Sequence, residues 1–261
     1  MKGTKLFIIF AYIQFSLYLI LIVSLFYFLE PSLFFETISS ERIKYSIKLS
    51  ILCATIATFL SIIVAIPTAY ALSRFEFFGR KFIDILLELP LIVSPAALGA
   101  MILIFFNNPI GNWLKENSFD AIFTVKGIVL AQFIATAGVA TRLIKAVIDE
   151  IPKRYEDVAR TLGATPIKAF YTITLPLSKK GIYASSIFTW AKALGEFGAT
   201  ITVAGTMALK TETLPIAIFM SLTGANIREA VVLILLILSI GFGLIFVVKN
   251  IISIKKKYAD Y

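Results

Sequence analysis

The stretch YEDVARTLGATPIKAFYTITLP, residues 155–176, is the longest polar and charged interruption in an otherwise apolar chain. Its first half has the spacing i, i+3, i+4, i+7 of one apolar helix face, formed by Tyr155, Val158, Ala159 and Leu162. Pro152, just before it, suits the first turn of a helix, where no backbone N–H is needed. Gly163 stands where the residue after a helix takes a positive φ. The pattern predicts a short helix that ends at this glycine.

The second half of the stretch predicts another short helix. Thr165 and Pro166 follow each other in the order of an N-cap and a first helical residue. The apolar side of this helix consists of Ile167, Phe170 and Tyr171. Pro176 is expected to end the helix, because proline breaks the backbone hydrogen bonding of a helix interior.

The composition of the chain predicts a polytopic membrane protein. Of its 261 residues, 59% are hydrophobic, and the mean hydropathy is +0.90, well above the range of soluble domains. Histidine is absent and Cys53 is the single cysteine. An intrachain disulfide, a Cys/His metal site and a Ser-His-Asp triad are therefore excluded. The net charge of +9 is explained by basic loops on the cytoplasmic side of a membrane rather than by binding of nucleic acid.

Six apolar runs predict six transmembrane helices in one all-α domain over residues 1–261. Most of them approach or exceed the length that crosses a bilayer, and they cover residues 6–29, 45–72, 83–106, 127–143, 181–206 and 230–252. The first is too long for a signal peptide. Residues 31–44 are polar and acidic, and residues 107–126 are polar and rich in turn-forming residues. A short re-entrant or surface helix is expected around 214–222.

The distribution of Lys and Arg predicts the orientation. Most of the 25 basic residues fall near the two termini, in the loop after residue 73 and in residues 148–180. Because basic loops stay in the cytoplasm, both termini and the loop 148–180 are expected there.

The 155–176 stretch resembles the EAA loop of ABC importer permeases. That loop has an acidic residue followed by two small residues, a glycine six positions after the acid, and then I-x-L-P. The matching residues here are Asp157, Val158, Ala159, Gly163, Ile173, Leu175 and Pro176. Asp and Val replace the family's Glu and first Ala, and Glu156 is a neighbouring acid. The resemblance implies a type I permease fold and a coupling helix, including Tyr155, Arg160 and Leu162, that docks into a cytoplasmic ATPase. The alternative is an ordinary amphipathic helix at the membrane surface.

A charged pair is predicted inside the fifth apolar run. Lys192 and Glu196 are four residues apart, which on a continuous helix places them on one face where they can neutralise each other. Because charges are costly in lipid, that face must meet protein or water. Gly195 and Gly198 permit close helix packing. These residues either line a translocation pathway or only pin the helix bundle, and both interpretations stay open.

Three further runs resemble the molybdate, tungstate and sulfate group of these permeases. They are LPLIVSPAALG at 89–99, WAKALGEFGAT at 190–200 and TETLPIAI at 211–218, so that the similarity covers a core of residues 45–250. The resemblance implies a homodimer in the cell membrane with two ATPase subunits and an external binding protein. The substrate it implies is molybdate or tungstate, with sulfate or another anion as the alternative.

The chain is expected to be a transport subunit rather than an enzyme. It has no G-x-x-x-x-G-K-[ST] phosphate-binding loop, so ATP and Mg are expected on the partner ATPase, and no cofactor, metal or catalytic residue is assigned to this chain. Two other classes have less support from the sequence. An ion-coupled secondary transporter favours titratable groups in repeated halves, and an intramembrane enzyme requires a catalytic cluster; no internal repeat or such cluster is evident.

Overall fold

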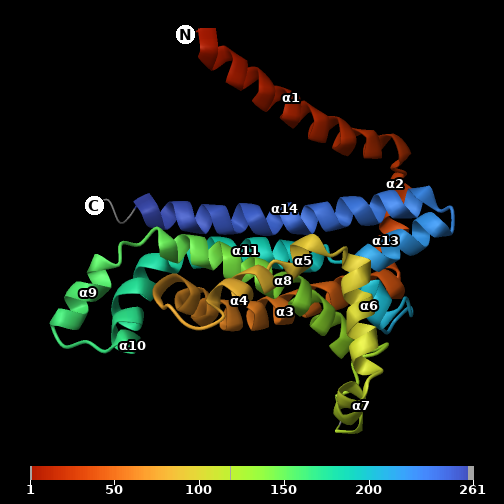
Figure 1. Ribbon diagram of the computed structural model, residues 1–261. Helices are drawn as coiled ribbons and strands as arrows, with labels where there is room; N and C mark the ends of the chain where they lie inside the picture. Colours follow the sequence, from red (N-terminus) through yellow and green to blue (C-terminus); the bar gives the residue numbers. More distant parts are fainter. Residues whose placement is uncertain (1, 118, 258–261) are drawn as a thin grey trace.

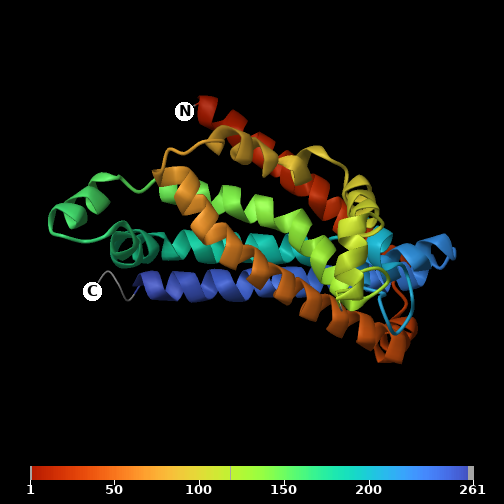
Figure 2. The ribbon, with the colours of Figure 1, turned by 60° about the horizontal axis from the view of Figure 1, so that its bottom comes forward.

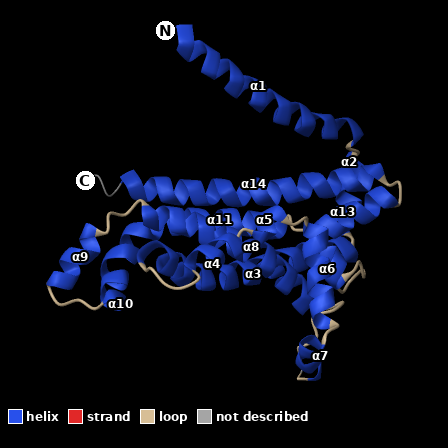
Figure 3. Ribbon diagram, in the orientation of Figure 1, coloured by secondary structure: helices blue, strands red, loops and turns tan. Residues whose placement is uncertain are grey.

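The computed structural model describes residues 2–117 and 119–257, and within these ranges it is built from helices without any strand (Figure 3). The predicted all-α class is confirmed. Residues 1, 118 and 258–261, which the predicted single domain also includes, lie outside the described residues.

Four long helices lie side by side and form the body of the molecule (Figures 1 and 2). They are α3 (Glu41–Arg74), α8 (Val125–Asp149), α11 (Leu175–Leu194) and α14 (Ile227–Lys257). Small residues let α3 and α8 approach closely, as expected inside a membrane. Ala65 and Ala140 are fully buried in the same cluster as Ile144, and the hydroxyls of Ser61 and Thr136 are 3.0 Å apart.

The N-terminal helix stands apart from this body. Helix α1 (Lys2–Leu25), with the short η1 (Phe26–Phe28), diverges from the bundle (Figure 1), and none of its apolar window is buried. The polar residues 31–44 are helical, since α2 (Pro31–Ser39) and the first turn of α3 occupy them. Ser40 explains the start of α3, since its Oγ accepts a hydrogen bond from the N–H of Ile43 at 3.3 Å.

The third apolar run is not one straight span. It folds into α4 (Arg80–Leu86), α5 (Leu89–Ile92) and α6 (Pro95–Phe106), followed by α7 (Pro109–Glu116) in the polar region that is rich in turn-forming residues. The axis bends by 114° between α5 and α6. Pro95 lacks the N–H that would continue a helix through this point, and Ser94 caps the new helix by accepting from Ala97 N.

The fifth apolar run is also broken. Helix α11 ends at Leu194, and α12 (Gly198–Ala204) starts after a short non-helical link, so the continuous span predicted over 181–206 is wrong. The helix expected around 214–222 is confirmed as α13 (Leu214–Thr223). Instead of lying on the surface, it buries Leu214 and Ala217 in a cluster with Ile43 of α3 and Leu233 of α14.

The number of membrane spans is smaller by simple criteria than the six predicted. Among the described residues, the helices α1, α3, α8 and α14 are long and apolar enough to cross a bilayer, and the bent α4–α6 segment adds a fifth if it counts as one span. Helix α11 carries Lys179, Lys180 and Lys192 and does not meet these criteria.

Candidate functional site

Residues 152–176 form two helices that project from one end of the bundle, beside the end of α14 (Figures 1 and 2). Helix α9 (Arg154–Thr161) and helix α10 (Pro166–Ala169) are joined at Gly163, whose φ is +87°. Thr165 caps α10 by accepting from Lys168 N at 3.2 Å. The two predicted helices and their glycine joint are therefore confirmed, although Pro152 precedes the first turn of α9.

Pro176 does not end the second helix, contrary to the prediction. A π-helical turn, η2 (Phe170–Thr174), joins α10 to α11, and the N–H of Leu175 donates to the carbonyl of Phe170 five residues earlier. A π turn is wider than an α turn, which leaves room for the proline ring that would otherwise clash with a preceding carbonyl. The backbone therefore stays helical from α10 through η2 into α11, although α10 stands at an angle to α11 (Figures 1 and 2).

The carboxylate of Glu156 anchors α9 to the bundle. Arg74 Nε donates to its Oε1 at 2.7 Å, Thr174 Oγ1 to the same oxygen at 2.5 Å, and Tyr70 Oη to Oε2 at 2.9 Å. The side chains of Arg74 and Glu156 are only 6% and 9% exposed. Arg74 Nη2 also donates to the carbonyls of Ile148 and Ile151. This polar network thus ties α3, the end of α8, α9 and η2 together.

The same network sets the ionisation of Glu156. Burial alone would raise the pKa of its carboxyl, but hydrogen bonds from Thr174, Arg74 and Tyr70 outweigh burial and hold the pKa below its ordinary value. Glu156 is therefore a carboxylate at neutral pH, and its charge is neutralised by Arg74 inside the fold.

The outer surface of the loop carries apolar and acidic groups that nothing in the described chain covers. Leu162 is 84% exposed, and Tyr155, Val158 and Ile167 are also exposed. Asp157 is exposed and lines a hollow of about 560 Å³ that includes Arg160 and Gly163.

The remaining predicted residues of this loop face the bundle or lie at its edge. Ala159, Ile173 and Leu175 are half-buried, and Leu175 packs against the cluster between α3 and α8. Pro176 is exposed. The two adjacent acids therefore divide their roles: Glu156 points into the fold, while Asp157 points outward.

A second group of predicted residues surrounds a cavity of about 640 Å³ where α6, α11 and α12 meet. Its walls are formed by Ser94, Pro95, Ala96, Ala191, Lys192, Gly195, Glu196, Phe197 and Gly198. The predicted neutralising pair is wrong, because α11 ends at Leu194 and the two charges do not share a helix. Glu196 instead accepts from Ala199 N at 3.0 Å and is buried. Within the described residues, Lys192 makes no ion pair.

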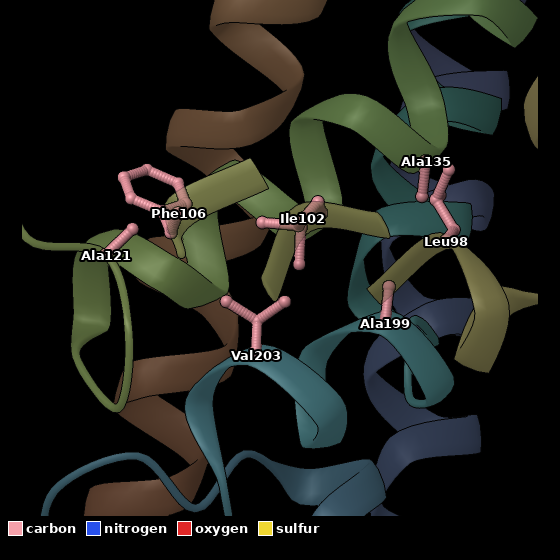
Figure 4. Close-up of a cluster of buried hydrophobic side chains, with 8 residues drawn as sticks. Leu98, Ile102, Phe106, Ala121, Ala135, Ala199 and Val203 are labelled. Atoms are coloured by element: carbon pink, nitrogen blue, oxygen red, sulfur yellow. The ribbon is translucent and has the colours of Figure 1, made fainter. Parts of the chain in front are cut away.

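The two predicted glycines differ in packing. A Cβ on Gly198 would lie 2.7 Å from Pro95 Cβ, whereas one on Gly195 would lie at an ordinary 3.6 Å from a carbonyl oxygen. Gly99 of α6 is packed just as closely against α12, because a Cβ placed on it would lie 2.7 Å from Thr202 Cβ. Figure 4 shows the resulting crossing, with Leu98 of α6 close to Ala199 of α12. Gly198 therefore permits the close approach of α6 and α12.

Two ion pairs at the ends of the bundle were missed by sequence reasoning. One is Arg74–Glu156. The other is Arg42 of α3, which donates to both carboxylate oxygens of Glu212, at 2.8 and 2.5 Å. The Glu212 side chain is 1% exposed. One hint of this pair is visible in the sequence, which is the acidic residue at position 212 within the TETLPIAI run. Nothing in the sequence indicated that Arg42 is its partner.

Comparison with known proteins places these features in one family. Residues 57–254 match the family described as "Binding-protein-dependent transport system inner membrane component". The molybdenum transport system permease protein ModB of Haemophilus influenzae is 36% identical over 67% of this chain and 77% of its own length. The sulfate transport system permease protein CysW of Synechocystis sp. is 33% identical over 72% of this chain and 68% of its own.

A solved structure shows the same fold. A chain of the bacterial alginate ABC transporter, in complex with a periplasmic protein that holds an alginate pentasaccharide, superposes with a TM-score of 0.73. It covers 92% of this chain and 88% of that chain, at 17% sequence identity. At this identity the likeness is one of fold alone.

Proposed function

This chain belongs to the family of binding-protein-dependent transport system inner membrane components, and we propose that it is the permease subunit through which an ATP-driven importer moves an oxyanion. The observation that carries the proposal is the loop of α9 and α10, which projects from the bundle with an uncovered apolar surface and is anchored at its base by Glu156. The chain is a multi-pass membrane protein and a transport subunit, not an enzyme.

The projecting loop is the docking site for the ATPase. Leu162, Val158 and Ile167 supply the apolar contacts, and Asp157 supplies an outward charge beside the hollow at Gly163. In this proposal residues 148–180 and both termini lie in the cytoplasm, in keeping with the basic residues there. ATP and Mg are bound by the ATPase rather than by this chain.

The assembly consists of two copies of this chain, two ATPase subunits and an external binding protein that delivers the substrate, in a lipid membrane and without nucleic acid. The permease domain is residues 1–261, with a core of 45–250. ATP-driven closure of the ATPases displaces the loop, and α11 carries this displacement to the cavity at Lys192. Energy thus enters as a bias between two packed states.

The proposed substrate is molybdate or tungstate. Support comes from the 36% identity to the molybdenum permease and from the three sequence runs that resemble this group. Sulfate is the second candidate, because the sulfate permease is 33% identical. These tetrahedral dianions carry the same charge and differ mainly in size.

Purification of the tagged chain from its native membrane tests both the class and the substrate. The buffer contains molybdate, tungstate and sulfate, co-purifying subunits are identified by mass spectrometry, and bound anions are assayed by elemental analysis. An ATPase with molybdenum or tungsten is the expected result. An ATPase with sulfate alone would move the substrate to the second candidate.

The contrary outcome is equally specific. If no ATPase is recovered in mild detergent, and crosslinking from position 162 also captures none, the assignment of the loop as a docking site is wrong. An ion-coupled transporter would then be the better interpretation. A Leu162→Ser variant tests the docking surface separately from folding. It changes only an exposed side chain of the loop, so it should lower ATPase recovery without unfolding the chain.

A further inference from the structure

We propose that Lys192 is the residue of this chain that contacts the transported oxyanion, in the cavity between α6, α11 and α12. The inference rests on the proposed function and deepens it, since it places a substrate contact on the permease itself. It also decides between the two interpretations that the sequence leaves open for the charged residues of the fifth apolar run.

The ammonium of Lys192 lacks an anionic partner in the described residues. Within the described part of the chain it makes no ion pair, and the expected partner Glu196 is buried and accepts from Ala199 N at 3.0 Å. A lysine held only to pin helices would be expected to pair with that carboxylate. Lys192 is instead half-buried and lines the cavity.

The surroundings of this ammonium are the walls of the cavity. A lysine within an apolar segment is costly in lipid and belongs where it meets protein or water. The other walls of the cavity are mostly small side chains, contributed by Ala96, Ala191, Gly195 and Gly198 among others, and Lys192 is the cation among the lining residues. The cavity thus holds one cation and one anion. The half-buried Lys192 is the more accessible of the two, because Glu196 is buried and accepts from Ala199 N.

The cavity is large enough to admit an oxyanion. The cavity has a volume of about 640 Å³ and is open to the outside, so a tetrahedral oxyanion fits inside it. An oxyanion can enter with part of its hydration shell and meet a single ammonium. Such a contact is strong enough to favour entry and weak enough to allow release, which is what a translocation pathway requires.

Chemical protection of Lys192 tests the contact directly. The full-length chain in lipid nanodiscs is treated with the neutral acetylating reagent N-acetoxysuccinimide, and the acetylation rates of Lys192 and Lys44 are read from the same sample by peptide mass spectrometry. Lys44 is exposed near the start of α3 and far from the cavity in sequence. Sulfate, molybdate and tungstate are titrated separately against chloride at equal ionic strength.

We expect at least one of the three oxyanions to slow acetylation of Lys192 saturably, at least threefold, with no change at Lys44. Equal effects of chloride would overturn the proposal, as would a Lys192 rate that no oxyanion changes. A Lys192 that the reagent cannot reach while Lys44 is consumed would also overturn it, because the cavity would then be closed to water.

Transport kinetics separate contact from packing. In the assembled transporter, Lys192→Met should raise the KM for uptake at least tenfold, and Lys192→Arg should restore most of it, since both cations bind oxyanions. Lys44→Met, which removes an exposed lysine outside the cavity, should leave KM near the parent value. If Glu196→Gln rescues Lys192→Met, the two residues form a structural pair and the proposal fails.

The two proposals fail separately. The protection assay needs only this chain and anions, whereas recovery of the ATPase depends on the projecting loop and not on Lys192. An unprotected Lys192 with the ATPase still recovered would remove the substrate contact alone.

Discussion

Arg74 and Glu156 are 82 positions apart in the chain, yet the Nε of the arginine and the Oε1 of the glutamate lie 2.7 Å apart. The pair joins the last residue of α3 to the first turn of α9. Because Arg74 also donates to the carbonyls of Ile148 and Ile151, a force on α9 acts on α3 and α8 together. The loop is therefore not a flexible appendage of the bundle.

Loss of the Glu156 carboxylate should destabilise the protein strongly. Glu156→Ala leaves Arg74 buried without its partner, and removal of one member of a buried pair costs about 3–5 kcal/mol. The melting temperature in detergent measures the effect. Glu150→Ala, which removes an exposed acid nearby, is the control and should melt like the parent. Equal melting of all three proteins would show that the network contributes nothing.

The contribution of Glu156 should depend on pH in one direction. Its pKa in the fold is lowered, so its stabilisation is complete above the ordinary glutamate pKa of about 4.3 and is lost as pH falls through the folded value. The difference in melting temperature between the parent and Glu156→Gln should be constant from about pH 7 to 5 and should shrink below about pH 4.3. A difference that grows in acid would contradict the assignment.

Gly163 offers a test of docking that is separate from folding. No atom lies within 4 Å of a Cβ built on Gly163 or on Gly79, and both have positive φ. Most non-glycine residues cost about 1–2 kcal/mol in either place. Asparagine and aspartate both tolerate this conformation better, so variants with these two residues differ mainly in charge. Gly163→Asp should lower ATPase co-purification about tenfold, and Gly163→Asn should lower it less.

Gly79→Asp provides the matched control, because it brings the same backbone strain and charge to a different loop. It should leave ATPase recovery at the parent level. If both aspartate variants lose the ATPase equally, the effect arises from general destabilisation and not from the surface of the projecting loop.

The crossing of α6 and α12 should be sensitive at one glycine and not at its neighbour. A methyl group on Gly198 meets Pro95 Cβ at 2.7 Å, while one on Gly195 has ordinary room. Gly198→Ala should therefore lose about 1–3 kcal/mol, typical of overpacking, and Gly195→Ala should lose much less. Thermal melting of both variants checks this, and a reversed order would refute the close crossing of the two helices at Gly198.

The pair Arg42–Glu212 should matter for stability more than a similar pair nearby. Glu212→Ala removes two charge-assisted hydrogen bonds from Arg42, but Arg42 is 37% exposed and still lies 3.6 Å from Glu229, so the expected loss is about 1–3 kcal/mol. Arg228 and Glu30 also form an ion pair, but both side chains are largely exposed, so Arg228→Ala should cost less than about 1 kcal/mol. Similar melting temperatures for the two variants would contradict this ranking.

Local signals in the sequence predicted the helices of the projecting loop well. The apolar spacing of α9, the glycine at 163 and the cap at Thr165 act over one or two turns, so each could be interpreted without knowing the rest of the fold. The helix end predicted at Pro176 is the exception. The π turn before it depends on tertiary packing, and no residue type predicts such a turn.

The broken helices and the buried pairs could not be predicted in the same way. Hydropathy does not depend on the direction of the helix axis. The segments with the 114° bend between α5 and α6 and with the link after Leu194 therefore have the same apolar pattern as continuous helices. Pro95 was a visible signal for the first break, whereas the second has only glycines near it. Arg74 and Glu156 meet because two helices end at the same place, and that is a property of the whole fold.

The π turn at Phe170–Thr174 has a mechanical consequence. It keeps the backbone helical past Pro176 while α10 stands at an angle to α11, so that displacement of the projecting loop is passed directly to α11 (Figure 1). The 20 residues of α11 span about 30 Å at about 1.5 Å per residue. A rotation of α11 by about 10° about its Leu175 end would move its far end by about 5 Å, and that end is where α11 stops, two residues beyond Lys192.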